Sequence, residues 1–391
     1  MIKLYETQSF LKECNTTVES CTENEGVVYI KLKESIFFPE EGGQYADTGV
    51  LEYADKCVNL IDGQIVDGEI IYQISEMIPE GTTVLCKLDW NKRFDRMQNH
   101  SGEHILSGLI NSKYGFNNIG FHLSDDEFVT LNMDGVLTKE QVMELEKEVN
   151  SIIYANVPIT DSYPSKEELA NITYRSKIEI DGQVRLITIG DEKQTYDICA
   201  CCAPHVARTG EIGILKITGV SKAKGGVLIS ILCGRRALEY INHSMDTLNA
   251  LAGSFTTHPD NVPGIVENLK KECQELKAEL SDYKERGLID AIKANPLKNY
   301  VITADSLSPQ NMKNVFNTLV DNCQGYVGVF VGTDEDGYRY YAGGKDCDAK
   351  VLSGLMREKL GAKGGGSSDM IQGKADTNAG SIEEFWNNIC N

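Results

Sequence analysis

The chain has 391 residues, more than one hydrophobic core usually holds, which predicts roughly two to four domains. Hydrophobic residues make up 41% and charged residues 25%, as in a globular protein. The first residues, MIKLYETQSF, lack the apolar stretch of a signal peptide, and no apolar run is long enough for a membrane helix. We therefore expect a cytoplasmic protein without membrane contact. The net charge of −20 argues against non-specific nucleic-acid binding over the whole surface.

Residues 1–89 contain short strand-like runs separated by turn residues, at 27–32, 56–61, 68–74 and 82–88. This pattern predicts a small β-barrel or a sandwich. The segment FFPEEGGQYADTG (37–49) is rich in turn residues, and its paired glycines Gly42 and Gly43 permit close approach of the backbone to a ligand.

Residues 90–240 have a mixed pattern that predicts an α+β domain. We expect a helix over 96–112, a second helix that starts at a capping box, Thr138 to Gln141, and strands at 184–189, 213–218 and 226–232.

Residues 241–290 are predicted to form a helical connector. Between 262 and 283 apolar residues recur at steps of four and three, a heptad pattern of about three repeats. The stripe is compatible with a helical spacer, a hairpin within the chain or the seam of a homodimer, and the seam is slightly favoured.

Residues 291–391 are predicted to form a separate α/β domain, with strands at 300–304, 326–332 and 338–344 and helices at 309–322 and 349–360. The glycine- and serine-rich segment 361–370 follows. It is expected to be a loop, which either presents backbone amides to an anion such as a phosphate or serves only as a flexible connection.

The strongest chemical signal is a split set of metal-ligand side chains, His100 and His104 in one segment and Cys201 and His205 in another. Residues four apart lie on one face of a helix, so the first pair can reach one ion. Three imidazoles and a thiolate suit zinc, which predicts one Zn²⁺ per chain. Ligands from two distant segments favour a cleft, where zinc polarises a carbonyl, orients a substrate or activates a water.

Two neighbouring cysteines, Cys199 and Cys202, could replace Cys201 as ligands, although buried thiols without a metal role are the preferred interpretation. The segment HSGEH also matches the H-x-x-E-H signature of a class of zinc metalloproteases, in which Glu103 would be the general base. That alternative leaves the second segment, with Cys201 and His205, unexplained.

Basic residues form several local groups that could contact RNA or lie on solvated faces. They are Lys92, Arg93 and Arg96; Lys222 and Lys224; Arg235 and Arg236; and Arg357, Lys359 and Lys363.

Five segments, in order, resemble the editing part of alanyl-tRNA synthetases and their free-standing AlaX relatives. FFPEEGGQYADTG is similar to the glycine motif of the editing domain, RMQNHSGEHILS to its HxxxH zinc helix and CCAPHVARTGEIG to its CxxxH segment. GGVLISILCGRRAL resembles the strand that closes this domain. GAKGGGSSDMIQG resembles the glycine motif of the C-terminal DHHA1 (C-Ala) domain.

The resemblance implies a long-form editing protein that acts in trans, because neither the aminoacylation domain nor the helical tRNA-recognition domain is found. It implies hydrolysis of the ester in tRNA(Ala) mischarged with serine or, second, glycine. The implied metal ligands are His100, His104, Cys201 and His205. The implied substrate-binding residues are Gly42, Gly43, Gln44 and Thr48, of which Gln44 and Thr48 would read the seryl hydroxyl; the implied tRNA-binding residues are Gly364, Gly365, Gly366, Arg235 and Arg236.

Two motifs depart from the family pattern. CCAPH replaces CGGTH, which puts Cys202 and Ala203 where glycines are usual, and GGGSSD replaces GGGRPD, which removes an arginine that could contact phosphate. Glu103 occupies a position that the family fills variably. A homodimer through the connector or the C-terminal domain is expected. The alternative functions are the metalloprotease and a non-catalytic, zinc-stabilised protein that binds tRNA or a synthetase.

Overall fold

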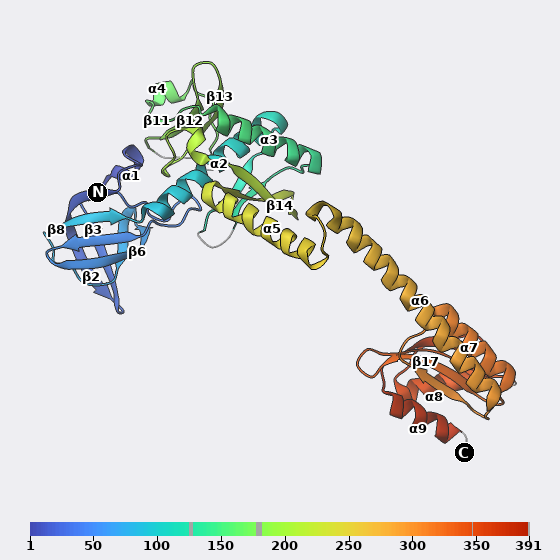
Figure 1. The fold of residues 1–391 in the computed structure, drawn as a ribbon. Helices are drawn as coiled ribbons and strands as arrows, with labels where there is room; N and C mark the ends of the chain where they lie inside the picture. Colours follow the sequence, from blue (N-terminus) through green and yellow to red (C-terminus); the bar gives the residue numbers. More distant parts are fainter. Residues whose placement is uncertain (125–127, 177–181, 346, 390–391) are drawn as a thin grey trace. The chain divides into compact units, whose positions relative to one another are not determined.

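The computed structural model describes residues 1–124, 128–176, 182–345 and 347–389, so the predicted C-terminal domain ends, at 390 and 391, outside the described residues. The chain divides into two compact units, Met1–Leu248 and Asn249–Asn391 (Figure 1). The α+β fold class with an N-terminal barrel and a C-terminal α/β region is confirmed. Among the described residues, none of the helices is both long and apolar enough to cross a membrane.

The first unit begins with a closed β-barrel, so the barrel, not the sandwich, is the correct alternative. Its strands follow one another around the barrel in the order β2-β3-β7-β6-β5-β8. They are β2 (Glu13–Asn24), β3 (Val27–Leu32), β5 (Gly49–Tyr53), β6 (Lys56–Val66), β7 (Glu69–Ile74) and β8 (Thr83–Leu88). The short elements β1 (Ile2–Lys3), α1 (Leu4–Thr7) and β4 (Glu34–Ser35) lie beside it. Alternate residues of β7, such as Tyr72, point inward and fill the barrel.

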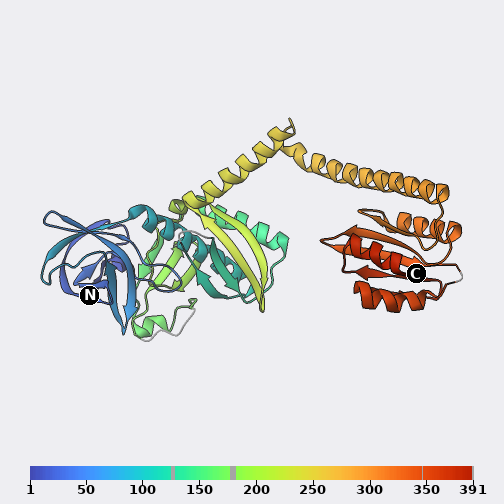
Figure 2. The ribbon, with the colours of Figure 1, turned by 90° about the horizontal axis from the view of Figure 1, so that it is seen from below.

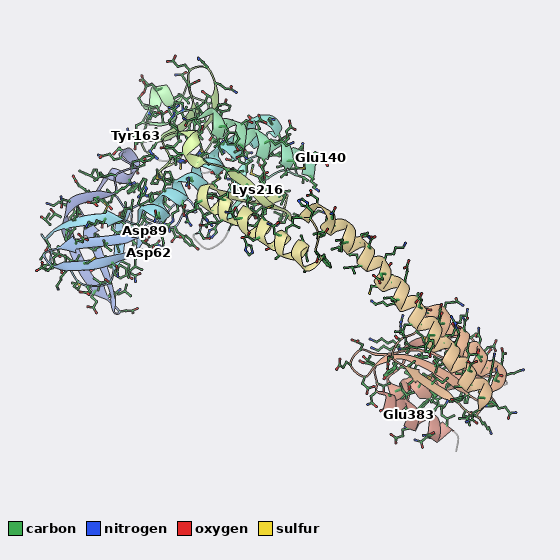
Figure 3. All side chains as sticks on the ribbon, viewed as in Figure 1. Asp62, Asp89, Glu140, Tyr163, Lys216 and Glu383 are labelled. Carbon is green, nitrogen blue, oxygen red and sulfur yellow. The ribbon has the colours of Figure 1, made fainter. Side chains whose placement is uncertain are left out.

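Helix α2 (Trp90–Tyr114) leads from the barrel into the mixed core (Figures 1 and 2). The Asp89 side chain, labelled in Figure 3, accepts a hydrogen bond from the Lys92 N–H and caps the first turn. Gly115 ends the helix in a left-handed conformation. From Met97 to Ile110 every residue of α2 is buried, so the helix forms the centre of the unit.

Two small sheets and one further helix enclose α2. One sheet has the order β14-β15-β10-β9 and the other β11-β12-β13. Their strands are β9 (Asn118–His122), β10 (Val129–Met133), β11 (Ile159–Ser162), β12 (Leu186–Gly190), β13 (Thr195–Ala200), β14 (Leu215–Ala223) and β15 (Gly226–Cys233). The predicted capping box between Thr138 and Gln141 is confirmed, and it starts α3 (Lys139–Ala155). The short helices α4 (Lys166–Leu169) and η1 (Thr209–Ile212) lie between strands, and α5 (Gly234–Ser254) spans the boundary between the units.

The second unit is a five-stranded sheet with the order β16-β17-β18-β20-β19. Its elements are η2 (Pro259–Asn261), α6 (Val262–Ala294), β16 (Val301–Ala304), α7 (Pro309–Asn322), β17 (Val327–Thr333), β18 (Gly337–Gly343), α8 (Ala349–Leu360), β19 (Lys363–Gly366), β20 (Met370–Ala375) and α9 (Ala379–Ile389). Val329 packs on the α7 side of the sheet, whereas Phe330 packs on the side of α8 and α9. The alternating side chains of β17 therefore serve two separate cores.

The expectation of a glycine-rich loop after residue 360 is wrong in part, because Lys363–Gly366 is the edge strand β19, paired antiparallel with β20. A Cβ on Gly364 would lie 2.1 Å from the Gln372 carbonyl oxygen and 2.8 Å from the Tyr340 hydroxyl. The glycines here allow two strands to approach closely, which glycine content alone does not distinguish from a loop.

The predicted heptad stripe lies on α6, a single helix of 33 residues. Apart from Val262, the apolar residues of the stripe between 262 and 283 are not buried within the described chain: Leu276 is 57% and Leu280 50% exposed. The stripe is thus an apolar surface on a helix, and its role as a dimer seam stays a prediction.

Candidate metal centre

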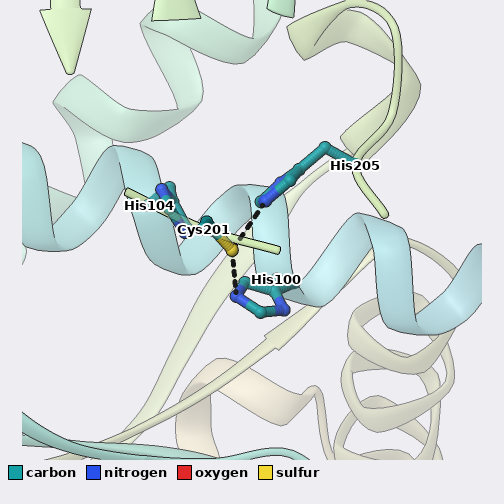
Figure 4. A group of neighbouring side chains, drawn as sticks. All are labelled: His100, His104, Cys201 and His205. Carbon is teal, nitrogen blue, oxygen red and sulfur yellow. Dashed lines mark hydrogen bonds between the residues drawn. The ribbon is translucent and has the colours of Figure 1, made fainter. Parts of the chain in front are cut away.

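The predicted metal ligands come together at the centre of the first unit. His100 and His104 project from consecutive turns of α2, and Cys201 and His205 follow β13 (Figure 4). The Cys201 Sγ lies 3.6 Å from the His100 Nε2 and 3.4 Å from the His205 Nε2. One ligand atom from each of the four side chains lies within 4.8 Å of the other three.

These distances fit a single zinc ion. A tetrahedral zinc with bonds of about 2.0–2.1 Å to nitrogen and about 2.3 Å to sulfur holds the nitrogen and the sulfur about 3.5 Å apart. The two measured sulfur–nitrogen distances, 3.6 and 3.4 Å, bracket that value. The three histidines are buried, each at most 4% exposed, so packing restricts the positions of their rings. The donor set therefore fits zinc in both type and spacing.

Each histidine presents its other ring nitrogen to a protein oxygen. The His100 Nδ1 contacts the Gln44 Oε1 at 2.7 Å, and the His205 Nδ1 contacts the Ser101 Oγ at 3.0 Å. The His104 Nδ1 lies 3.3 Å from the Asp197 Oδ2, although this contact lacks the geometry of a full hydrogen bond. Such contacts fix the ring orientation and the tautomer, which leaves Nε2 free for an ion.

A second group of side chains, His104, Asp197 and Cys199, also has metal-ligand spacing. Arg175 opposes a cation there, because its Nε and Nη2 donate to the two oxygens of Asp197 at 2.7 and 2.8 Å. Burial alone would raise the pKa of Asp197, but the hydrogen bonds with Arg175 and the contact with His104 lower it. Asp197 is therefore placed as a partner of His104, and the quartet is the better candidate for holding an ion.

Electrostatic interactions prepare Cys201 for binding a metal. Burial opposes the charged thiolate, yet the electrostatic interactions with His100 and His205 hold the pKa of the Cys201 thiol well below its usual value. Burial lowers the pKa of His205 to about 3, which keeps its imidazole neutral. For His104, burial lowers the pKa, but the charge of Cys199 and the contact with Asp197 raise it well above 6.5. His104 therefore has to lose a proton when a metal ion binds. A thiolate and neutral imidazoles are the forms that bind zinc.

The glycine motif reaches this centre through a tight turn. Glu41 and Gln44 exchange backbone hydrogen bonds of 3.1 and 3.2 Å, and Gly42 and Gly43 between them have φ of 63° and 87°. Two consecutive positive φ angles are those of a type I′ turn, which favours glycine at both positions. A Cβ on Gly43 would lie 2.1 Å from the Phe121 carbonyl oxygen, so the turn docks closely on the core. As a result Gln44, fully buried, reaches His100.

Glu103, the candidate general base, is buried beside the quartet. Its Oε1 accepts a hydrogen bond of 2.6 Å from the Asn118 side chain, and its Oε2 lies 3.8 Å from the His104 Nε2. The carboxylate is therefore held at the edge of the centre, with one oxygen near the His104 Nε2, a candidate metal ligand.

The remaining predicted residues lie away from the quartet. Thr48 lines a hollow of about 420 Å³ on the barrel, and its carbonyl oxygen accepts the Asp89 N–H. Arg235 forms ion pairs with Asp95 and Glu239, and Arg236 donates to the Ser124 carbonyl oxygen at 2.9 Å. Gly364, Gly365 and Gly366 belong to the other unit, in β19.

One predicted basic group is not a surface patch. Arg93 is 0% and Arg96 2% exposed, and both contact the buried carboxylate of Asp47 in the glycine motif. Asp47 also accepts the Phe38 N–H at 2.7 Å. These arginines join α2 to the glycine motif, which their charge alone did not reveal.

Sequence reasoning missed Asp197, Arg175 and Ser101, which orient or support the histidines. A signal existed for Asp197, because it lies two and four residues before Cys199 and Cys201 near the end of one strand, where alternate residues share a face. Arg175 and Ser101 follow no spacing rule and depend on the folded arrangement.

The candidate site lies within the part of the chain that matches known proteins. The family described as "Threonyl and Alanyl tRNA synthetase second additional domain" matches residues 184–229, which include Cys201 and His205. The chain is 26% identical to the alanyl-tRNA editing protein AlaX-L of Pyrococcus horikoshii, over 96% of this chain and 94% of that protein. It is 29% identical to the alanyl-tRNA editing protein Aarsd1 of Danio rerio, over 89% of this chain and 84% of that protein.

The alanine–tRNA ligase of Pyrobaculum arsenaticum is 30% identical over 88% of this chain but only 40% of its own length. The predicted resemblance to alanyl-tRNA editing proteins is thus confirmed along nearly the whole chain.

Proposed function

We propose that this protein is a zinc-dependent deacylase that acts in trans on mischarged tRNA(Ala) and hydrolyses the ester between the amino acid and the tRNA. One observation carries the proposal: the quartet His100, His104, Cys201 and His205 converges at zinc-ligand distances in a chain that resembles AlaX-L over 96% of its length. Serine is the expected wrong amino acid and glycine the second.

The chemistry of ester hydrolysis suits the residues around the quartet. A zinc ion bound there supplies a Lewis acid and a fixed positive charge near the ester. Gln44, Ser101 and Asp197 hold the three imidazoles in position, so little reorganisation accompanies substrate binding. Glu103, beside His104, is our candidate for accepting a proton from the attacking water.

A second hydrolytic site answers a specificity problem. A synthetase pocket sized for alanine cannot strongly reject glycine, or serine with one extra hydroxyl, so an editing site has to recognise what the first site admits. Gln44 is our candidate for reading the seryl hydroxyl, because its amide is buried beside His100. Thr48 has weaker support, since it lines a hollow on the barrel.

The rest of the tRNA is expected to contact basic and glycine-rich surfaces. Arg235 is an exposed cation whose ion pairs a phosphate could replace, and β19 is an exposed edge strand. The GGGSSD sequence after Lys363 lacks the arginine of the related motif, so we expect this segment to bind tRNA weakly. A homodimer through the exposed stripe of α6 would add a second copy of each surface.

The metalloprotease alternative has less support. A metalloprotease of this type needs a carboxylate as its third metal ligand. In this protein Cys201 and His205 complete the candidate quartet instead, and the Glu103 carboxylate accepts a hydrogen bond from Asn118. In the non-catalytic alternative, the zinc-loaded protein would bind tRNA tightly without turnover.

The test is deacylation of Ser-tRNA(Ala) compared with Ala-tRNA(Ala). The wild-type protein should cleave the serylated tRNA and spare the alanylated one. Cys201→Ala should remove both activity and bound zinc, whereas Cys57→Ala, at an exposed cysteine of the barrel, should change neither. Absence of cleavage at saturating, zinc-loaded enzyme would overturn the proposal.

A further inference from the structure

Two buried polar atoms of the tight turn at Glu41–Gln44 lack a hydrogen-bond partner among the described residues. They are the Oε2 of Glu41 and the Nε2 of Gln44. A buried acceptor or donor without a partner destabilises the folded protein, so each one calls for an explanation, such as a ligand group that forms the missing hydrogen bond. One atom is an acceptor with negative charge, and the other is a donor.

The tight turn places both side chains on one side. Glu41 and Gln44 are directly paired across it, and residues paired in this way project to the same face. Gln44 uses its Oε1 for His100, which leaves its amino group as the free donor. Glu41 lies beside Cys202, the neighbour of Cys201. Burial and the charge of Cys201 raise the pKa of the Cys202 thiol, and the charge of Glu41 and its side-chain contact with the thiol raise it further. That contact leaves the Glu41 Oε2 without a hydrogen bond of normal geometry.

The adjacent glutamate behaves differently. The Glu40 Oε2 accepts a hydrogen bond of 2.8 Å from the Gln64 side chain of the barrel, so its carboxylate is satisfied within the protein. The two neighbouring glutamates of this motif therefore differ: of the two, Glu41 has a buried oxygen without a hydrogen bond, and it lies beside Cys202.

We propose that Glu41 binds the α-ammonium group of the aminoacyl ester, while the Gln44 amide donates to an oxygen of the same amino acid. This inference rests on the proposed function. An aminoacyl ester carries a cationic donor and an oxygen acceptor around one carbon, which complements an anionic acceptor and a neutral donor paired across one turn. The substrate class is thus an aminoacyl ester with a free amine; an ester with an acylated amine lacks the charge that Glu41 needs.

The experiment compares Ser-tRNA(Ala) with N-acetyl-Ser-tRNA(Ala), both at the same zinc loading. Wild-type protein should cleave the free-amine substrate with a kcat/KM at least about tenfold higher, since hydrogen bonds to charged groups are the strong ones. Glu41→Gln should lower kcat/KM for Ser-tRNA(Ala) by about 10–100-fold and leave that for the acetylated substrate nearly unchanged. Glu40→Gln, with the same change of charge, should behave as wild type.

Three outcomes decide the matter. Equal cleavage of both substrates by wild-type protein would overturn the role of Glu41, and this comparison needs no variant. A Glu41→Gln protein that binds zinc normally and keeps the preference for the free amine would also overturn it. Cleavage of neither substrate by the zinc-loaded wild-type protein would instead overturn the proposed function, and this inference with it.

Discussion

The contact between Asp197 and His104 should govern how tightly the protein holds zinc. Asp197 supplies the only charged oxygen among the three that face the histidine Nδ1 atoms; the other two belong to Gln44 and Ser101. In Asp197→Asn the amide keeps an oxygen for Arg175 but loses the negative charge that helps to orient the His104 ring.

The expected effect is a 10- to 100-fold weaker zinc affinity, because partners of metal-binding histidines typically contribute that much. This corresponds to about 1.4–2.7 kcal/mol. We expect the loss of zinc affinity in Asp197→Asn to lie toward the upper end of this range, because a charge is removed from a buried site. Ser101→Ala removes only a neutral hydroxyl from His205 and should fall at the lower end.

Competition with a chromophoric chelator at fixed pH measures the apparent zinc affinity of each variant. Asp191→Asn is the matched control, because Asp191 lies in the β12–β13 turn and contacts backbone N–H groups that an asparagine also satisfies. If Asp197→Asn binds zinc as tightly as wild type, or if Asp191→Asn loses as much zinc affinity, the contact between Asp197 and His104 does not govern zinc binding.

Three further predictions follow from the same structure. Asp47→Ala leaves the buried Arg93 and Arg96 without their carboxylate, so urea denaturation should show a loss of about 3–5 kcal/mol; a change under about 1 kcal/mol would contradict this. Because the pKa of His104 is raised well above 6.5 and its proton competes with zinc, zinc affinity should keep rising as pH increases above 6.5, and a flat profile from 6.5 upward would be inconsistent. Leu276→Glu on α6 should convert a dimer to a monomer in light scattering, and a monomeric wild type at micromolar concentration would rule out the seam.

The ligand quartet could be predicted from sequence because both halves carry a spacing rule. His100 and His104 lie one helical turn apart, and Cys201 and His205 repeat that interval beyond the strand. The partners of these ligands could not be predicted in this way, since Asp197 and Arg175 reach His104 only through tertiary packing.

The fold shows the same contrast. Strand β3 has a dense apolar alternation and its bounds, Val27–Leu32, were predicted without error, whereas β2 (Glu13–Asn24) was missed because polar residues dominate it. The glycines of β19 indicated a loop, since composition cannot tell flexibility from close strand pairing. Arg93 and Arg96 were predicted to belong to a basic surface group, because the buried Asp47 that neutralises them lies far away in the sequence.

The central claim is that the quartet holds the zinc with which this protein deacylates mischarged tRNA(Ala). The most direct test measures the single-turnover rate of Ser-tRNA(Ala) hydrolysis as zinc is returned to metal-free protein. We expect the hydrolysis rate to rise in proportion to bound zinc and to stop rising at one zinc per chain. In His104→Ala the rate should not rise when zinc is added. Full activity without zinc, or no hydrolysis at one zinc per chain, would contradict the central claim.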